Sequence, residues 1–251
     1  MITSHILIAF SLVCLCALLS WRLNHGQERD LLKSSLRAIL QLGLLGYLLT
    51  WIFAHNTLGI SLLVALVMTV NSAIHARSRV KSRYRGLLLD NFLATVLSIW
   101  PLAFAGSFLL EGRPWWSVEH FLPLTGMLLG NTMNGISMGI DHFTHGIREK
   151  REEVLEWLAL GANVIESTRD IFRRSLKIAL TPIMNSMLTM GIVSIPGTMT
   201  GQILGGSSPM VAAFTQVVIA LLVAVGVYCG TLLGLVLARN RLFNHRGQPC
   251  Y

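Results

Sequence analysis

The stretch 178–238, IALTPIMNSMLTMGIVSIPGTMTGQILGGSSPMVAAFTQVVIALLVAVGVYCGTLLGLVLA, decides the fold of this chain. Its 61 residues contain no Asp, Glu, Lys or Arg. An apolar run of about 18 residues without charge is long enough to cross the hydrocarbon core of a bilayer. The stretch therefore has room for two membrane spans, which the Gly-, Ser- and Pro-rich segment 201–209 would separate.

Further charge-free runs occupy much of the remaining sequence, at 1–21, 38–76, 91–110 and 120–140. Charged residues make up only 13% of the 251 residues, against roughly 25% in a soluble domain. This composition excludes a soluble globule and a disordered chain. It also excludes a β-barrel, because barrel strands alternate polar and apolar residues. We predict an all-α integral membrane protein with one transmembrane domain over 1–251 and seven transmembrane helices, at about 2–21, 36–54, 58–76, 87–110, 120–140, 178–200 and 210–238.

The distribution of Lys and Arg predicts the orientation of these spans. With seven spans, 19 of the 20 Lys and Arg residues fall on one side of the membrane and only Arg113 on the other. Basic connections face the cytoplasm, so we expect the N-terminus outside and the C-terminus inside. The formal net charge of +8 then reflects topology and attraction to anionic lipid. Nucleic-acid binding is not expected, because the basic residues are divided among four short connections.

The segment 141–177 is the one long connection, and we expect it to lie in the cytoplasm. A charged stretch from Arg148 to Glu156 predicts a helix that ends near Gly161, and a second helix would follow over 164–177. The first helix either lies on lipid or docks into a groove of a cytoplasmic protein. Four apolar positions of this segment recur at helical spacing and share one predicted face: Leu155, Leu158, Ala159 and Ala162.

The sequence EVLEWLALGA at 153–162 resembles the EAA loop of ABC-transporter permeases, which is the coupling helix that seats in the ATPase subunit. The Leu-Pro that normally follows the loop glycine is replaced here by Arg173-Arg174. Over about 30–245, the chain resembles the FetB family of permeases, described as iron exporters and related to a plant aluminium-tolerance half-transporter. The segments that carry this resemblance are RAILQL at 37–42, GMLLGNTM at 126–133, LALGA at 158–162 and GIVSIPGTMTGQ at 191–202.

The resemblance implies a permease subunit in the inner (plasma) membrane that exports a metal ion, with iron first. Two copies would pair with two cytoplasmic ABC ATPase subunits. The chain has no phosphate-binding Gly-rich loop, so it is not an enzyme, and ATP and Mg would be bound by the partner rather than by any cofactor site here. The residues expected to couple to the ATPase are Glu153, Glu156, Leu158, Leu160, Gly161 and Ala162.

Several polar residues lie in or near the apolar segments, where contact with lipid would be costly. They either form hydrogen bonds between helices or line a pathway for a polar solute. Broken helices tend to lie at transport sites, and 178–201 contains Pro182, Gly191, Pro196, Gly197 and Gly201. The candidate pathway residues are Gln41, Asn71, Asn131, Asn134, Asn185, Pro196, Gly197 and Gln202; Asn91 and Gln216 share the same polar character.

The sequence contains only a weak candidate for a metal site, the trio Asp141, His142 and His145 beside the fifth predicted span. A solute that is not a metal ion fits the chain equally well. The pattern Gly-Ile-Ser-Met-Gly around Ser137 also matches a serine nucleophile motif. That motif requires a strand-to-helix turn, whereas Ser137 falls in a predicted helix, so an intramembrane serine protease is a minor alternative.

Overall fold

The computed structural model describes residues 2–55, 57–110 and 117–244. The predicted external Arg113 and the C-terminal Arg246 lie outside these residues. The described chain forms helices throughout, joined by short connections. Charged residues lie at the ends of several long helices, such as α1, α3 and α10, whereas α2 and α8 end within charge-free runs. Their bounds are α1 Ile2–Arg22, α2 Glu28–Ala54, α3 Leu58–Arg79, α4 Leu87–Leu109, α5 Val118–Glu149, α6 Arg151–Ala159, α7 Val164–Ser167, α8 Arg169–Thr189, α9 Gly197–Leu204 and α10 Pro209–Leu242.

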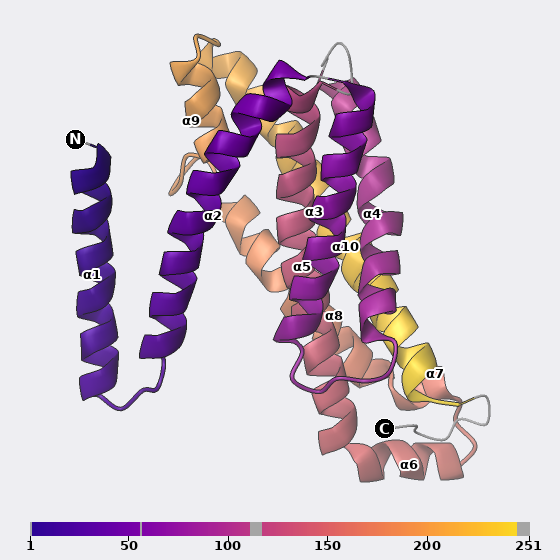
Figure 1. The fold of residues 1–251 in the computed structure, drawn as a ribbon. Coiled ribbons are helices and arrows are strands. Elements are labelled where there is room, and N and C mark those ends of the chain that lie inside the picture. The colour runs from indigo at the N-terminus through magenta and orange to yellow at the C-terminus, as the bar shows by residue number, and fades with distance from the viewer. Residues whose placement is uncertain (1, 56, 111–116, 245–251) are drawn as a thin grey trace. The chain divides into compact units, whose positions relative to one another are not determined.

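Two compact units make up the chain. The first unit, Met1–Asn56, holds α1 and α2, which pack against each other. The second unit, Thr57–Tyr251, holds all the other helices. In the second unit α5 is the central helix, because α3, α4, α8 and α10 all pack against it (Figure 1).

Five helices are long and apolar enough to span a membrane: α1, α2, α3, α4 and α10. Helix α5 covers the predicted span 120–140, but its many Gly, Asn and Thr residues make it less apolar. The fold is thus an all-α membrane fold with five candidate spans among the described residues. The count of seven spans and the orientation of the termini stay predictions.

The predicted sixth span, 178–200, is not one continuous helix. Helix α8 ends at Thr189, and α9 begins at Gly197 after a turn. Gly191 adopts the left-handed conformation (φ +82°), its N–H donates to the Ser194 carbonyl at 2.8 Å, and Pro196 precedes α9 as its N-cap. Glycine tolerates this conformation and proline has no N–H to continue a helix. The eight residues of α9 span only about 12 Å, so α9 is too short to cross the bilayer.

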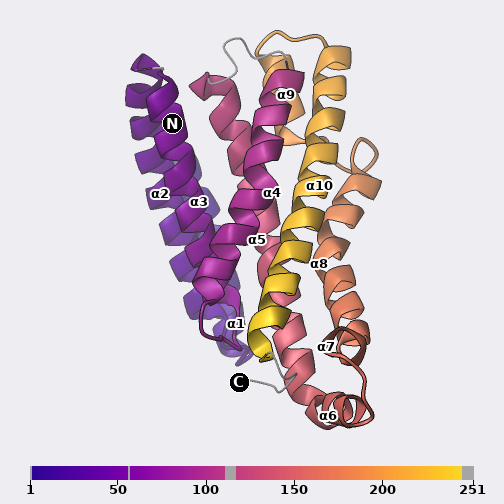
Figure 2. The same cartoon turned by 90° about the vertical axis from the view of Figure 1, so that its right-hand side faces the viewer.

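The basic connections of the second unit lie at one end of it. Figures 1 and 2 show that the α3–α4 connection, α6, α7 and the end of α10 lie together, whereas α9 lies at the opposite end. We call the end that carries α6 the basic end. A core of buried apolar residues from α4, α5, α6 and α10 stabilises it, including Ile140, Phe143, Val154 and Leu235. Burial of such side chains contributes about 1.5–3 kcal/mol each.

Candidate functional site

Helix α6 lies across the end of α5 at the basic end (Figures 1 and 2). Val154 is 2% exposed, and Leu158 packs against the same core cluster. Of the four residues on the predicted apolar face, Leu158 and Ala162 are half-buried, whereas Leu155 and Ala159 are exposed. Val154 lies one turn before Leu158 on the same side of α6. The helix therefore packs on the core through Val154 and Leu158, and the side that carries Leu155 and Ala159 stays exposed.

The turn after α6 has a defined conformation. Gly161 has φ +95°, and the N–H of Ala162 donates to the Trp157 carbonyl at 3.0 Å. Asn163 then caps α7: its Oδ1 accepts the N–H of Glu166 at 2.9 Å, and the Glu166 carboxylate accepts the N–H of Asn163 at 2.8 Å. This capping box satisfies two helix-end donors reciprocally, so the turn is held in one conformation.

Large apolar side chains remain exposed around this turn. Leu160 is 84% exposed, Ile165 58%, Trp157 53% and Leu155 38%. We call these four residues the α6 apolar surface. The other predicted coupling residues lie beside it: Glu153 and Glu156 are exposed, and Glu153 pairs with Lys150 at 2.7 Å. The six predicted coupling residues lie within 153–162, on α6 and the turn after it, and their coupling role stays a prediction.

The predicted pathway residues are not gathered into one site. Gln41 lies on α2 in the first unit, while Pro196, Gly197 and Gln202 lie at or in α9. Asn71 and Asn131 donate to carbonyls of their own helices, Val67 at 2.9 Å and Met127 at 2.8 Å. Gln216 on α10 instead joins two elements, because it accepts a hydrogen bond from Thr198 of α9.

Helices α5 and α8 nevertheless each carry a stripe of mostly polar residues, here called the polar stripes. Positions spaced by three and four residues share one helix face. All members of the two stripes are exposed except the half-buried Met138. On α5 the stripe contains Asn131, Asn134, Met138, His142 and His145, and on α8 it contains Arg174, Lys177, Thr181, Asn185 and Leu188.

A groove of about 990 Å³ opens where the two stripes meet the basic end. His142 and His145 line it from α5, Glu153 and Trp157 from α6, and Arg174 and Lys177 from α8. The stripes therefore run from this groove toward the predicted membrane interior. Asn134 on α5 and Asn185 on α8 lie in the parts of the two stripes beyond the groove.

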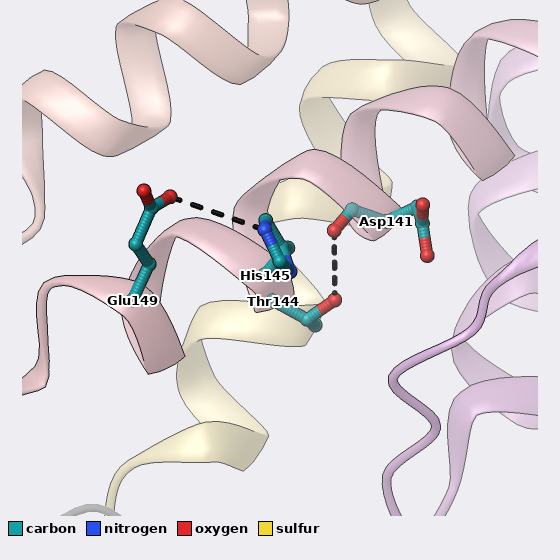
Figure 3. A network of polar contacts seen from close by, with 4 residues as sticks. All are labelled: Asp141, Thr144, His145 and Glu149. Atoms are coloured by element: carbon teal, nitrogen blue, oxygen red, sulfur yellow. Dashed lines mark hydrogen bonds and ion pairs between the residues drawn. The ribbon is translucent and has the colours of Figure 1, made fainter.

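The trio predicted as a weak metal site is separated. The Asp141 carboxylate accepts the backbone N–H of Lys81 at 2.7 Å and points away from His145 (Figure 3). His145 Nε2 lies 3.9 Å from the Glu149 carboxylate on the other side (Figure 3). No group of three or more metal-ligating side chains occurs in the described part of the chain. The donors present therefore do not form a ready-made site for a bare cation.

Ser137 is a packing residue. It is 2% exposed, and its hydroxyl donates to the Asn134 carbonyl of its own helix at 3.1 Å. A Cβ on Gly135 or Gly139 would lie within 3 Å of Thr231 on α10, so these glycines allow close approach of α5 and α10. The serine motif lies within a helix, without the turn that a nucleophile requires.

Two polar pairs were missed by sequence reasoning. Arg79 at the end of α3 donates to Asn134 Oδ1 at 2.7 Å. Arg241 Nε at the end of α10 lies 2.7 Å from Asp90 Oδ1, and Asp90 is 1% exposed. Asp90 is the single charged residue in 87–110. An ionisable residue inside an apolar span generally has a partner, which was the available signal.

The fold and these contacts define a multi-helix membrane protein with a structured segment at its basic end. Residues 3–243 match the family described as Uncharacterised protein family (UPF0014), and the chain belongs to this family. No solved structure matches it.

Three relatives cover most of the chain. UPF0014 membrane protein slr1647 of Synechocystis is 32% identical over 92% of this chain and 90% of its own length. The Probable iron export permease protein FetB of Escherichia coli is 28% identical over 96% and 92%, respectively. Protein ALUMINUM SENSITIVE 3 of Arabidopsis is 31% identical over 84% and 76%. The predicted resemblance to the FetB family is confirmed, and the chain is a membrane permease of this family.

Proposed function

We propose that this chain is the permease subunit of an ABC transporter and that α6 and the turn after it dock onto a separate cytoplasmic ATPase. One observation carries the proposal. The α6 apolar surface is exposed, while Val154 and Leu158 hold the same helix against the core. An exposed apolar surface on a rigid support is typical of a protein-binding site.

The charges around α6 favour a protein partner over lipid. Glu152, Glu153 and Glu156 are exposed on the same helix, and among the described residues only Glu153 of these three forms an ion pair, with Lys150. An anionic membrane surface attracts basic helices and would repel these carboxylates. An interfacial helix lying on lipid is therefore the weaker alternative.

The polar stripes support a homodimer that encloses a pathway. Asn131, Asn134 and Asn185 are exposed in the single chain, and exposing such amides to lipid is costly. A second copy that covers the α5 and α8 stripes would remove them from lipid and enclose a polar path. Asn71, Gln202, Pro196 and Gly197 would lie on elements next to this path, and Gln41 is assigned to it from sequence alone.

In this proposal the chain crosses the membrane seven times, and α8, the turn at Gly191 and α9 together form the sixth crossing. Its N-terminus lies outside and its C-terminus in the cytoplasm of the inner membrane. Movement of the ATPase would shift α6 and, through α7, tilt α8. The cargo proposed first is iron, since the relative FetB is named a probable iron export permease. A solute other than a metal ion is the second candidate, because the described residues contain no metal-ligand cluster. Asp141, His142 and His145 do not act together as ligands in this proposal.

The experiment is co-purification of the full chain with the ABC ATPase of its own cell, followed by ATPase assays in vesicles. Leu160→Glu should abolish co-purification and stimulated hydrolysis, because it places a charge in the centre of the α6 apolar surface. The matched control, Ser78→Glu, adds the same charge at an exposed position at the end of α3 and should leave both unchanged. Normal coupling in Leu160→Glu would refute the docking role of α6.

A further inference from the structure

We propose that the groove between α5, α6 and α8 binds a phosphate-bearing anion, either a lipid headgroup or a soluble phosphate compound. This inference concerns binding by the chain itself, so it goes beyond the proposed coupling to an ATPase and does not depend on it.

The charges of the groove are the first observation. Four basic residues of α8 line it: Arg169, Arg173, Arg174 and Lys177. They follow helical spacing on the first three turns of α8, so their side chains are brought to one opening of about 990 Å³. No hydrogen bond or ion pair is recorded for any of these four side chains among the described residues.

Three of the four carboxylates that line the same groove already contact a neighbouring residue. Glu153 pairs with Lys150 at 2.7 Å, Glu166 is held in the capping box by the N–H of Asn163, and Glu149 faces His145 at 3.9 Å. Only Asp170 has no recorded side-chain partner among the four acidic residues lining the groove. By formal charge the lining holds five basic and four acidic residues, and Lys150 pairs with Glu153. The remaining positive charge is concentrated in the four basic groups on α8, and this side of the groove favours an anionic ligand.

The position of the groove is the second observation. Lys177 is the last charged residue before the apolar run that begins at Ile178, so the basic side chains lie at the predicted boundary between hydrocarbon and water. Arginine and lysine at such a boundary bind the phosphates of lipid headgroups and of soluble ligands alike.

The chemistry of the side chains fits a phosphate. Arg173 and Arg174 offer planar guanidinium groups that donate paired hydrogen bonds to phosphate oxygens. His142 and His145 face the basic residues from α5 across the groove and can donate additional hydrogen bonds. A bare divalent cation would be repelled by the same residues.

The test uses the full chain and inorganic pyrophosphate as the probe. Binding is measured by calorimetry in a neutral detergent, for the unaltered chain and three double variants. Arg173→Gln with Arg174→Gln should weaken binding about tenfold or more. Arg173→Lys with Arg174→Lys keeps the charge but loses the paired hydrogen bonds, so it should bind more tightly than the glutamine pair and more weakly than the unaltered chain. Arg148→Gln with Arg151→Gln removes the same charge from exposed positions nearby that do not line the groove, and should bind as the unaltered chain does.

Two further arms distinguish the sources of the anion. The chain is placed in phosphatidylcholine nanodiscs with or without phosphatidylglycerol, and pyrophosphate binding is measured again. Loss of binding in the phosphatidylglycerol discs assigns the groove to a lipid headgroup, and unchanged binding assigns it to a soluble anion. Equal weakening by the Arg173/Arg174 and Arg148/Arg151 glutamine pairs would overturn the site, because binding would then follow net charge alone. Absence of pyrophosphate binding in detergent, with no enrichment of phosphatidylglycerol over phosphatidylcholine on the purified chain, would overturn it as well.

Discussion

The pair formed by Asp90 and Arg241 predicts an unequal response to mutation of its two members. The Asp90 side chain is 1% exposed, whereas that of Arg241 is 41% exposed, and Arg241 Nε lies 2.7 Å from Asp90 Oδ1. The perturbations are Arg241→Gln and Asp90→Asn, each made alone. Asp90→Asn leaves the volume of the site unchanged, and Arg241→Gln shortens a side chain that is 41% exposed, so the difference between the variants mainly reports charge.

The expected loss of unfolding free energy in each variant follows from the burial of the two side chains. In Arg241→Gln the Asp90 carboxylate stays buried without its cation, and removing one partner of a buried ion pair costs about 3–5 kcal/mol. In Asp90→Asn the guanidinium of Arg241 can be hydrated at the surface, and the amide oxygen still accepts a hydrogen bond, so the loss is about 1–2 kcal/mol. We therefore expect Arg241→Gln to be the more destabilising by about 2–3 kcal/mol.

The assay is reversible unfolding in mixed micelles, from which the free energy of unfolding of each variant is obtained. Arg22→Gln serves as the control, because Arg22 is exposed at the end of α1 in the other unit. Equal losses in the two variants, or a larger loss in Asp90→Asn, would refute the reasoning that the buried carboxylate depends on Arg241.

Three further changes test other parts of the fold. Gly230→Ala should cost about 1–3 kcal/mol of unfolding free energy, because a Cβ there would lie 2.3 Å from Thr132 Cγ2. The control Gly130→Ala, with nothing within 4 Å, should be neutral or stabilising by up to about 1 kcal/mol. A larger loss of stability in Gly130→Ala than in Gly230→Ala would contradict the packing. Asn163→Ala removes the capping box and should cost about 0.5–2 kcal/mol, read as faster amide exchange over Val164–Ser167; unchanged exchange there would show that the cap does not hold α7. Burial, followed by the nearby Asp90 carboxylate, raises the pKa of the Tyr84 phenol above its ordinary value, so the unfolded chain ionises first and stability should fall as the pH rises above about 10. Tyr84→Phe should make this alkaline fall in unfolding free energy shallower, and an unchanged pH dependence would exclude Tyr84 as its source.

The long helices could be predicted from sequence because charge marks their ends. Arg22, Arg79 and Arg239 close apolar runs at or near the observed ends of α1, α3 and α10. In a membrane protein, hydrocarbon excludes charged groups and unpaired backbone groups. The positions of charged residues in the sequence therefore predict where many of the helices begin and end. The end of α6 could also be predicted, because Gly161 follows the last turn of this helix as expected.

The break between α8 and α9 could not be predicted from charge, because 178–238 contains none. Gly191 and Pro196 predicted an irregular helix, but both a kinked helix and a complete break are compatible with these two residues. The buried flank of α6 depended on the position of Val154 against the core. The contacts of Arg79 with Asn134 and of Arg241 with Asp90 join residues far apart in sequence, and helical spacing holds no information on such pairs.

The length of α8 sets a scale for mechanical coupling. Its 21 residues form a segment of about 32 Å that begins next to α7 and ends at the turn leading to α9. If its α7 end served as the pivot, a rotation of about 10° would carry Thr189 sideways by about 5–6 Å, by simple trigonometry on that length. A displacement of that size equals about one helical turn, 5.4 Å. In the proposed transporter, a modest rotation at one surface of the bilayer would therefore be enough to change the packing near the other.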